Sequence, residues 1–354
     1  MTLTALGLPA IRRDPGELQT DMPRSGPLID TFGRVATDLR VSLTDRCNLR
    51  CTYCMPAEGL DWLPGDELLT RDELTRLLAL AVTRLGITNV RFTGGEPLLY
   101  RGLEEVVAAA AALSPRPEIA LTTNGVGLAR RAQALVDAGL DRVNVSLDSL
   151  DAAHFASITR RDRLPDVLDG LAAAAAAGLG PVKVNAVLDP DSGLTDAVEL
   201  LDYCLRYGYQ LRIIEQMPLD ADHLWRRDVS LGADEIFAAL AERFDLSADP
   251  APRGSAPAQL WQVNGGPATV GIIASVSHAF CSACDRTRLT ADGQIRNCLF
   301  AAEESDLRTL LRNGADDDAL ELVWRAAMWR KAAGHGINDP GFVQPHRPMS
   351  AIGG

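Results

Sequence analysis

The stretch LRVSLTDRCNLRCTYCMP, residues 39–56, joins a short β-rich run to a loop that carries three cysteines. Cys47, Cys51 and Cys54 have the spacing C-x3-C-x2-C. A tetrahedral metal ion or a cubane iron–sulfur cluster takes four ligands, and this loop supplies three. The loop therefore predicts a metal centre directly after a strand, with one coordination position left for a ligand from elsewhere.

The chain beyond this loop alternates β-rich and helical runs. Strands are expected at 39–44, 89–97, 118–125, 141–149, 182–188 and 210–217, and helices at 70–86, 103–113, 128–139, 151–178 and 195–207. Thr70 and Glu73 form the capping-box pattern of the first helix. Such alternation predicts a parallel sheet with right-handed crossovers. Six strand–helix units are too few for a closed barrel, so we expect an α/β fold, a partial (β/α)6 barrel of the TIM type.

Three regions are expected from this organisation. Residues 1–37 are interpreted as a flexible N-terminal extension, 38–217 as the partial barrel, and 218–354 as an α+β domain that covers the open side of the barrel. Residues 245–260 are predicted to form a loop from their composition. Ligands of parallel sheets bind at the carboxyl ends of the strands, so polar residues from several strands should converge on one mouth.

The net charge and the distribution of apolar residues argue against some classes of protein. The net charge of −12 argues against a nucleic-acid binder, although a local cluster of arginines could still bind a small anion. No segment has the apolar length of a membrane span or the core of a secretion signal, so a cytoplasmic location is expected. Six of the seven cysteines fall into two groups, and Cys204 is interpreted as an inert buried thiol on a helix.

The first cysteine group favours an iron–sulfur cluster. Three thiolates can hold three irons of a [4Fe–4S] cubane and leave the fourth iron open. The alternative is a structural zinc ion with a distant fourth ligand, but such sites usually show paired C-x2-C knuckles. The loop has no second C-x2-C pair, and an aromatic residue, Tyr53, lies between its last two cysteines.

The second cysteine group is less specific. Cys281, Cys284 and Cys298 have the spacing C-x2-C-x13-C, and His278 could complete a zinc site of the Cys3His type. No second pair of ligands closes such a site, and the partner motif points to iron–sulfur chemistry. We therefore favour a second [4Fe–4S] cluster and keep zinc as the alternative.

The first loop, C-x3-C-x-aromatic-C, together with TGGEP at 93–97, resembles the radical S-adenosylmethionine (SAM) superfamily. That resemblance implies that SAM fills the open coordination position. With CDRTR in the second group, and with RFTGGEPLL, LTTNG, NVSLDSL, VKVNAV and a final MSAIGG in order, residues 31–354 resemble the GTP 3′,8-cyclase family of molybdenum cofactor biosynthesis. This implies a deoxyadenosyl radical that abstracts the ribose 3′ hydrogen of GTP, after which the sugar radical attacks guanine C8.

The resemblance also implies a role for individual residues. The first cluster would be held by Cys47, Cys51 and Cys54, and the second by Cys281, Cys284 and Cys298. The implied SAM contacts are Tyr53, Gly95, Ser146 and Met217. The implied GTP contacts are Arg40, Arg91, Thr122, Lys183, Arg286, Thr287 and Arg288. The terminal Gly353 and Gly354 would enter the active site, where larger side chains would not fit.

Other arginines receive a simpler interpretation, as solvated faces or helix ends: Arg130, Arg131, Arg160, Arg161, Arg163, Arg226 and Arg227. The expected partners are GTP, SAM, an electron donor, cyclic pyranopterin monophosphate synthase as the next enzyme, and a second copy of the chain in a homodimer. Two alternatives stay open: a radical SAM enzyme that modifies a peptide, and a zinc-stabilised binding module without catalysis. Neither a membrane nor a nucleic acid is expected as a partner.

Overall fold

The computed structural model describes residues 21–353, and its strands form one sheet in the order β12-β11-β10-β1-β2-β3-β4-β5-β6-β9-β8-β7. The strands are β1 Asp38–Ser42, β2 Asn89–Thr93, β3 Glu118–Thr123, β4 Arg142–Ser146, β5 Lys183–Val187, β6 Gln210–Ile214, β7 Leu246–Ala248, β8 Gln259–Val263, β9 Thr269–Ile273, β10 Arg286–Leu289, β11 Gln294–Arg296 and β12 Ser305–Asp306. From β10 through β1 to β6 and on to β9, every neighbouring pair is parallel.

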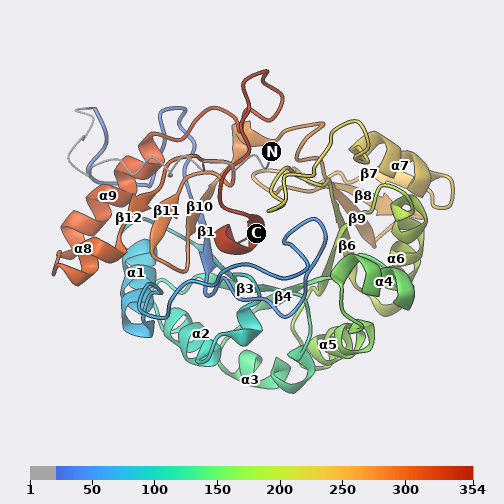
Figure 1. Ribbon diagram of the computed structural model, residues 1–354, viewed down its shortest axis with the longest axis horizontal. Coiled ribbons are helices and arrows are strands. Elements are labelled where there is room, and N and C mark those ends of the chain that lie inside the picture. The colour runs from blue at the N-terminus through green and yellow to red at the C-terminus, as the bar shows by residue number, and fades with distance from the viewer. Residues whose placement is uncertain (1–20, 354) are drawn as a thin grey trace, which may run out of the picture.

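The helices lie mainly outside the curve of this sheet, whereas the C-terminal end of the chain lies inside it (Figure 1). They are α1 Arg71–Thr83, α2 Leu103–Ala111, α3 Ala132–Asp137, α4 Ala152–Thr159, α5 Leu164–Ala176, α6 Gly193–Tyr207, α7 Ala233–Ala241, α8 Arg308–Arg312, α9 Asp317–Trp329 and α10 Met349–Ile352. Single 3-10 turns are formed by η1 Pro97–Leu99, η2 Leu128–Arg130 and η3 Cys281–Ala283.

The predicted partial barrel is confirmed. The six expected strands are β1 to β6, and they are parallel and adjacent in sequence order. The C-terminal region adds β10 beside β1 and β9 beside β6, so it extends the barrel sheet at both edges. Beyond β10, the strands β11 and β12 continue the sheet in antiparallel pairing, and beyond β9 the strands β8 and β7 do the same. The open side of the barrel is therefore narrowed by strands of the same sheet.

The start of α1 illustrates how local sequence sets an element. Thr70 accepts a hydrogen bond from the Glu73 amide, and the Glu73 carboxylate accepts one from the Thr70 amide, which is the predicted capping box. Leu77 and Leu78 face the core with exposures of 0% and 1%. The helix ends at Thr83, and Gly86 follows it with a φ of +77°. Its apolar face packs onto the outside of the sheet.

Two sequence expectations need correction. Residues 1–20 of the expected flexible extension lie outside the described residues, but residues 21–37 are anchored at several points: Leu28 is fully buried, and Arg34 donates to the carbonyl of Cys281. Residues 245–260 are not a loop throughout. Residues 246–248 form β7 and pair with residues 261–263 of β8, whereas Gln259 and Leu260 begin β8 and pair with β9.

Cys204 lies on α6 in the hydrophobic core, as predicted, and is fully buried. Burial raises the pKa of its thiol to about 12, which disfavours the reactive thiolate. Within residues 21–353 no helix combines the length and the apolar character needed to cross a bilayer.

Candidate active site

A cavity of about 500 Å³ lies inside the curve of the sheet and is lined by all six clustered cysteines. Its volume is within the range of small-molecule sites. The predicted contacts that also line it are Arg40, Tyr53, Arg91, Gly95, Thr122, Ser146, Lys183, Met217, Arg286 and Arg288. Residues far apart in the sequence thus meet in one space, because the parallel strands deliver them to the same side.

The TGGEP turn holds the first cysteine loop in place. The Gly95 amide donates to the Thr44 carbonyl at 2.7 Å, and the Glu96 amide donates to the Arg46 carbonyl at 2.7 Å. A Cβ atom at Gly95 would lie 2.4 Å from the Arg46 carbonyl oxygen. We conclude that glycine is required here first by the close approach of the cysteine loop, a constraint that does not depend on any ligand.

Thiols of the first group are strongly desolvated. Burial raises the pKa of Cys47 to about 11 and that of Cys54 to about 12. The pKa of Cys51 is also raised, first by burial and then by the neighbouring Asp148 and the other two cysteines. Thiolates packed this closely need a compensating positive charge, which a metal centre provides. The donor set therefore fits an iron–sulfur cluster.

One arginine that we interpreted as a solvated helix end supports this loop. Arg160 Nη1 donates to the carbonyls of Met55 at 2.9 Å and of Arg50 at 3.3 Å. Arg131, Arg163 and Arg226, by contrast, form the expected ion pairs with Glu104, Asp166 and Asp228. No local pattern distinguishes Arg160 from the others, because its partners lie about a hundred residues away in sequence.

The second cysteine group is next to cationic side chains. Burial opposes ionisation of Cys284, but the charges of Arg286 and Lys331 outweigh it and lower the pKa of Cys284 to about 7. Lys331 Nζ lies 3.2 Å from Cys284 Sγ and donates to the Arg286 carbonyl at 2.8 Å. The pKa of Cys281 is raised, mainly by burial. We did not predict a role for Lys331 from the sequence, because no recognisable motif surrounds it.

The arrangement does not match the zinc alternative for this group. His278 is 61% exposed, lies near Asp234 and does not line the cavity. Among residues 21–353, no three metal-ligating side chains converge to hold a single metal ion. A cubane does not require such convergence, because each thiolate binds a different iron.

Arginines form a row across three adjacent strands. Arg40 lies directly opposite Arg91 on β2 and opposite Arg288 on β10. Like charges opposite each other on a sheet are unfavourable, and here burial adds to the cost. The Nε atoms of Arg40 and Arg91 are buried without a hydrogen-bond partner in the described part of the chain.

These surroundings lower the pKa of all three arginines. Burial, followed by the charge of Arg40, lowers the pKa of both Arg91 and Arg288. Burial also lowers the pKa of Arg40, with Asp38 opposing the shift. Guanidinium groups keep their proton in proteins, so the row is a concentration of poorly balanced positive charge.

Lys183 and Thr122 are further polar residues of the cavity lining. Asn144 on β4 lies opposite Thr122 on one side and Lys183 on the other. Burial, then the charges of Arg142, Arg212 and Arg91, lower the pKa of Lys183 to about 8. Arg212 also lines the cavity, although we did not predict it from the sequence.

Thr287 is not part of the cavity lining. It lies between Arg286 and Arg288 on β10, and side chains alternate between the two faces of a strand. Its hydroxyl therefore points to the opposite face, where it accepts a hydrogen bond from Trp324 Nε1 at 3.1 Å. The Thr287 side chain thus faces away from the cavity, and the expected GTP contact at this residue stays a prediction.

The predicted SAM contacts line the same cavity as the first cysteine group. Tyr53 donates its hydroxyl to Asp148 Oδ2 at 2.8 Å, and the Val187 amide donates to Asp148 Oδ1. Burial raises the pKa of Asp148 to about 6. Ser146 ends β4, and Met217 follows β6. The sequence did not identify Asp148 as the partner that orients Tyr53.

The C-terminal tail enters the cavity region. Met349 and Ser350 line the cavity, and the Gly353 carbonyl accepts a hydrogen bond from Arg288 Nη1 at 2.6 Å. Gly353 has a φ of +84°, and a Cβ atom there would lie 2.9 Å from Thr93 Cγ2. Both observations require glycine at this position. Gly354 lies outside the described residues.

Two family models match the chain. Residues 41–204 match the model described as Radical SAM superfamily, and residues 209–337 match Molybdenum Cofactor Synthesis C. The fold is similar to that of Streptococcus suis SuiB in its crystal structure with S-adenosylmethionine. The TM-score is 0.56 at 14% identity, over 89% of this chain and 75% of that chain. The fold and the cysteine-lined cavity are those of a radical SAM enzyme.

Sequence relatives define the family within this class. GTP 3′,8-cyclase of Mycobacterium sp. strain KMS is 76% identical over 354 residues, and GTP 3′,8-cyclase of Mycolicibacterium smegmatis is 74% identical over 361 residues. Both alignments cover 100% of this chain and 100% of the relative. The chain therefore belongs to the GTP 3′,8-cyclase family, whose radical SAM character implies SAM and an iron–sulfur cluster.

Proposed function

We propose that this chain converts GTP to 3′,8-cyclo-7,8-dihydro-GTP, the first step of molybdenum cofactor biosynthesis. The observation that carries the substrate assignment is the row formed by Arg288, Arg40 and Arg91. Three guanidinium groups in register, one buried and two partly buried, would be unfavourable without a bound anion, and a triphosphate would neutralise them. The forked donors of arginine match pairs of phosphate oxygens.

The remaining cations fit the same ligand. Lys183 adds a point charge on β5, beyond β3 and β4 from the row, and Arg286 adds a second arginine on β10. Thr122 and Asn144 offer uncharged polar groups beside Lys183 for the sugar or base. We assign the triphosphate to the arginine row, which leaves the nucleoside between the two cysteine groups.

Two [4Fe–4S] clusters are proposed on the two cysteine groups. Cys47, Cys51 and Cys54 would hold the cluster that binds SAM, and Cys281, Cys284 and Cys298 would hold a cluster that faces the base. With these groups bound, SAM supplies the deoxyadenosyl radical that abstracts the ribose 3′ hydrogen. Tyr53, Gly95, Ser146 and Met217 are the proposed SAM contacts.

The chain's own residues then bind, orient and exclude water. The arginine row would bind the phosphates in one position. The ribose attached to them would then lie at a fixed distance from the residues proposed to bind SAM. The tail residues Met349 and Ser350 form part of the cavity wall, and Gly353 is hydrogen-bonded to Arg288. A closed cavity protects a sugar radical from quenching by solvent.

Further parts of the proposal concern the surroundings of the enzyme. The product would be taken by cyclic pyranopterin monophosphate synthase, and an external donor would supply the electron that reduces the first cluster. We also propose a cytoplasmic location and a homodimer. The division into a barrel region, 38–217, and a C-terminal region with the second cluster, 218–354, belongs to the same proposal.

The test is an anaerobic assay of the iron–sulfur-loaded protein with a strong reductant and SAM. With GTP we expect 5′-deoxyadenosine and the cyclised nucleotide in matching amounts, and with ATP little of either. Equal release of 5′-deoxyadenosine with both nucleotides, without a cyclised product, would contradict the proposal and favour another radical SAM substrate, such as a peptide.

A further inference from the structure

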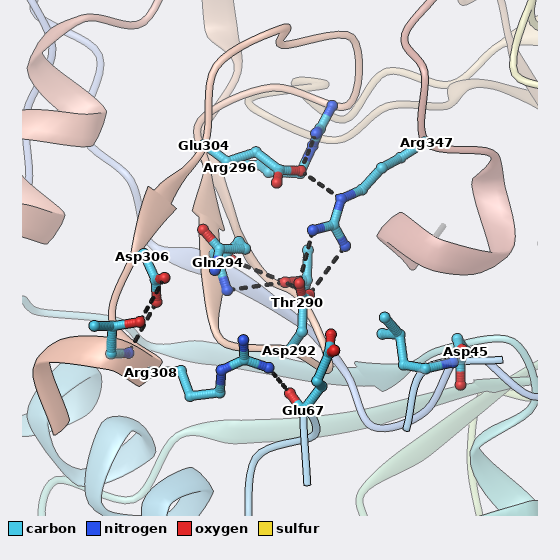
Figure 2. A network of polar contacts seen from close by, with 12 residues as sticks. Asp45, Glu67, Thr290, Asp292, Gln294, Arg296, Glu304, Asp306, Arg308 and Arg347 are labelled. Atoms are coloured by element: carbon cyan, nitrogen blue, oxygen red, sulfur yellow. Dashed lines mark hydrogen bonds and ion pairs between the residues drawn. The ribbon is translucent and has the colours of Figure 1, made fainter. Parts of the chain in front are cut away.

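Arg347 binds two carboxylates at the start of the C-terminal tail, residues 347–353. Its Nη1 and Nη2 atoms donate to Asp292 Oδ1 and Oδ2 at 2.9 and 2.7 Å. Its Nε atom lies 2.8 Å from Glu304 Oε1. Figure 2 shows the Arg347 side chain reaching both carboxylates. The guanidinium therefore binds one carboxylate through both of its Nη atoms and the other through Nε.

The two carboxylates are almost fully enclosed. The side chains of Asp292 and Glu304 are 5% and 1% exposed, and that of Arg347 is 20% exposed. Glu304 has a second cation, Arg296, whereas Asp292 is supported otherwise by the Thr290 hydroxyl at 2.6 Å. Loss of Arg347 would leave a buried Asp292 carboxylate without its cation. Such a contact is worth more than an ion pair on the surface.

The tail beyond Arg347 is short and is tied down at several points. Pro348 precedes α10, and the Met349 amide donates to the Leu219 carbonyl at 3.1 Å. The tail ends at Gly353, whose carbonyl accepts from Arg288 Nη1. A single helical turn is not stable by itself, so the tail depends on these anchors.

Both ends of the tail are attached to one structural unit, which we call the cysteine hairpin, residues 284–298. Arg347 binds Asp292 in the turn between β10 and β11, and Gly353 binds Arg288 on β10. The same hairpin begins at Cys284 and ends at Cys298. These two contacts hold the tail in a fixed position relative to the second cysteine group and to the arginines of β10.

We propose that Arg347 is a positioning residue that holds the C-terminal tail against the cysteine hairpin through Asp292 and Glu304. This proposal rests on the proposed function, since it explains how the tail reaches the nucleotide site. The proposal predicts that SAM cleavage and cyclisation depend on different parts of the chain. SAM cleavage needs the first cysteine group, whereas productive cyclisation also needs a tail fixed beside Arg288.

The test compares Arg347→Gln and Arg347→Lys with a matched control, Arg116→Gln. Arg116 makes a similar two-pronged pair with Asp141, at 2.8 and 3.1 Å, and does not line the cavity. Hydrogen–deuterium exchange is followed by mass spectrometry on the anaerobically purified, cluster-loaded proteins. In Arg347→Gln we expect amides of 349–353 to exchange about tenfold faster or more, with α1 and the barrel strands unchanged.

Arg347→Lys should fall between the wild type and Arg347→Gln, because lysine keeps the charge but loses the fork. Arg116→Gln should leave exchange of the tail unchanged. In the assay, Arg347→Gln should keep its iron content and its 5′-deoxyadenosine release while the cyclised product falls about tenfold or more. That pattern would distinguish a positioning role from general loss of stability.

The proposal is overturned if the tail of a folded Arg347→Gln variant exchanges at the wild-type rate. It is equally overturned if exchange rises uniformly over the whole chain. Should Arg347→Gln fail to fold, Asp292→Asn removes the charge of the partner while keeping its shape, and the same readings apply. Exchange of the tail needs no GTP turnover, so this result stands apart from failure of the proposed activity.

Discussion

Arg288 Nη1 donates a hydrogen bond of 2.6 Å to the carbonyl of Gly353, which joins the arginine row to the C-terminal tail. Gly353 is buried at φ +84°, where an added Cβ atom would meet Thr93 and Ser42. The tail thus has a defined place beside the proposed triphosphate site, and its glycine is required by backbone conformation as well as by space.

Gly353→Ala, and likewise deletion of Gly353 and Gly354, should abolish the cyclised product but leave 5′-deoxyadenosine release measurable. The reason is that an alanine cannot occupy this position without moving Thr93 or the tail itself. Chromatography of both products after anaerobic turnover checks this. An unchanged yield of cyclised nucleotide would remove the tail from the mechanism.

Arg91→Met should weaken GTP binding by about 10- to 100-fold while leaving the ligand-free protein as stable as before or more stable. Arg91 is partly buried opposite Arg40 and is repelled by it, so its loss removes an unfavourable interaction from the ligand-free protein. Equilibrium dialysis with GTP and thermal unfolding without it are the two measurements. The control Arg131→Met, which breaks a pair with Glu104, should lower the melting temperature and leave GTP binding intact. A lowered melting temperature for Arg91→Met with unchanged binding would contradict the assignment.

Lys183 predicts a pH effect with a definite sign. Its pKa in the folded chain is about 8, below the ordinary value of 10.5, because of burial and of Arg142, Arg212 and Arg91. Between these two pH values the unfolded chain binds a proton that the folded chain lacks. The free energy of unfolding should therefore rise with pH across this window, relative to Lys183→Met.

GTP binding should show the opposite trend. As pH rises past about 8, the free protein has lost the Lys183 charge, and binding then requires uptake of a proton. The dissociation constant for GTP should increase by up to about tenfold per pH unit in the wild type, with a shallower slope in Lys183→Met. Identical slopes in the two proteins would show that another group titrates.

Cys281→Ser should reduce the iron content to about half, because one of two equal clusters would be lost. The expected remainder is a cluster on the first cysteine group that still binds SAM. Iron and sulfide analysis with electron paramagnetic resonance spectra gives the answer. Full retention of iron would argue against a cluster on Cys281, Cys284 and Cys298.

Lys331→Met should shift the reduction potential of the second cluster to more negative values. Lys331 Nζ lies 3.2 Å from Cys284 Sγ, and a positive hydrogen-bond donor at a ligand sulfur stabilises the reduced cluster. A potentiometric titration monitored by electron paramagnetic resonance measures this, and Lys331→Arg should shift the potential less. No shift in Lys331→Met, at full iron content, would exclude this role.

The amino-acid sequence alone determined the order of the barrel strands, the two cysteine groups and the family. Strand and helix periodicity, the capping box at Thr70 and Glu73, and the cysteine spacing are all short-range patterns, so they can be read without a structure.

Only the tertiary structure decided how distant residues meet. The register of β10 with β1 placed Arg288 opposite Arg40, the twofold alternation of β10 turned Thr287 away, and folding brought Lys331 to Cys284 and Arg347 to Asp292. No local pattern encodes these pairings, because the position of β10 beside β1, its register and the docking of the tail are set by packing of the whole chain. Gly95 is the clearest case: the motif marked it, and the structure supplied the close backbone approach that explains it.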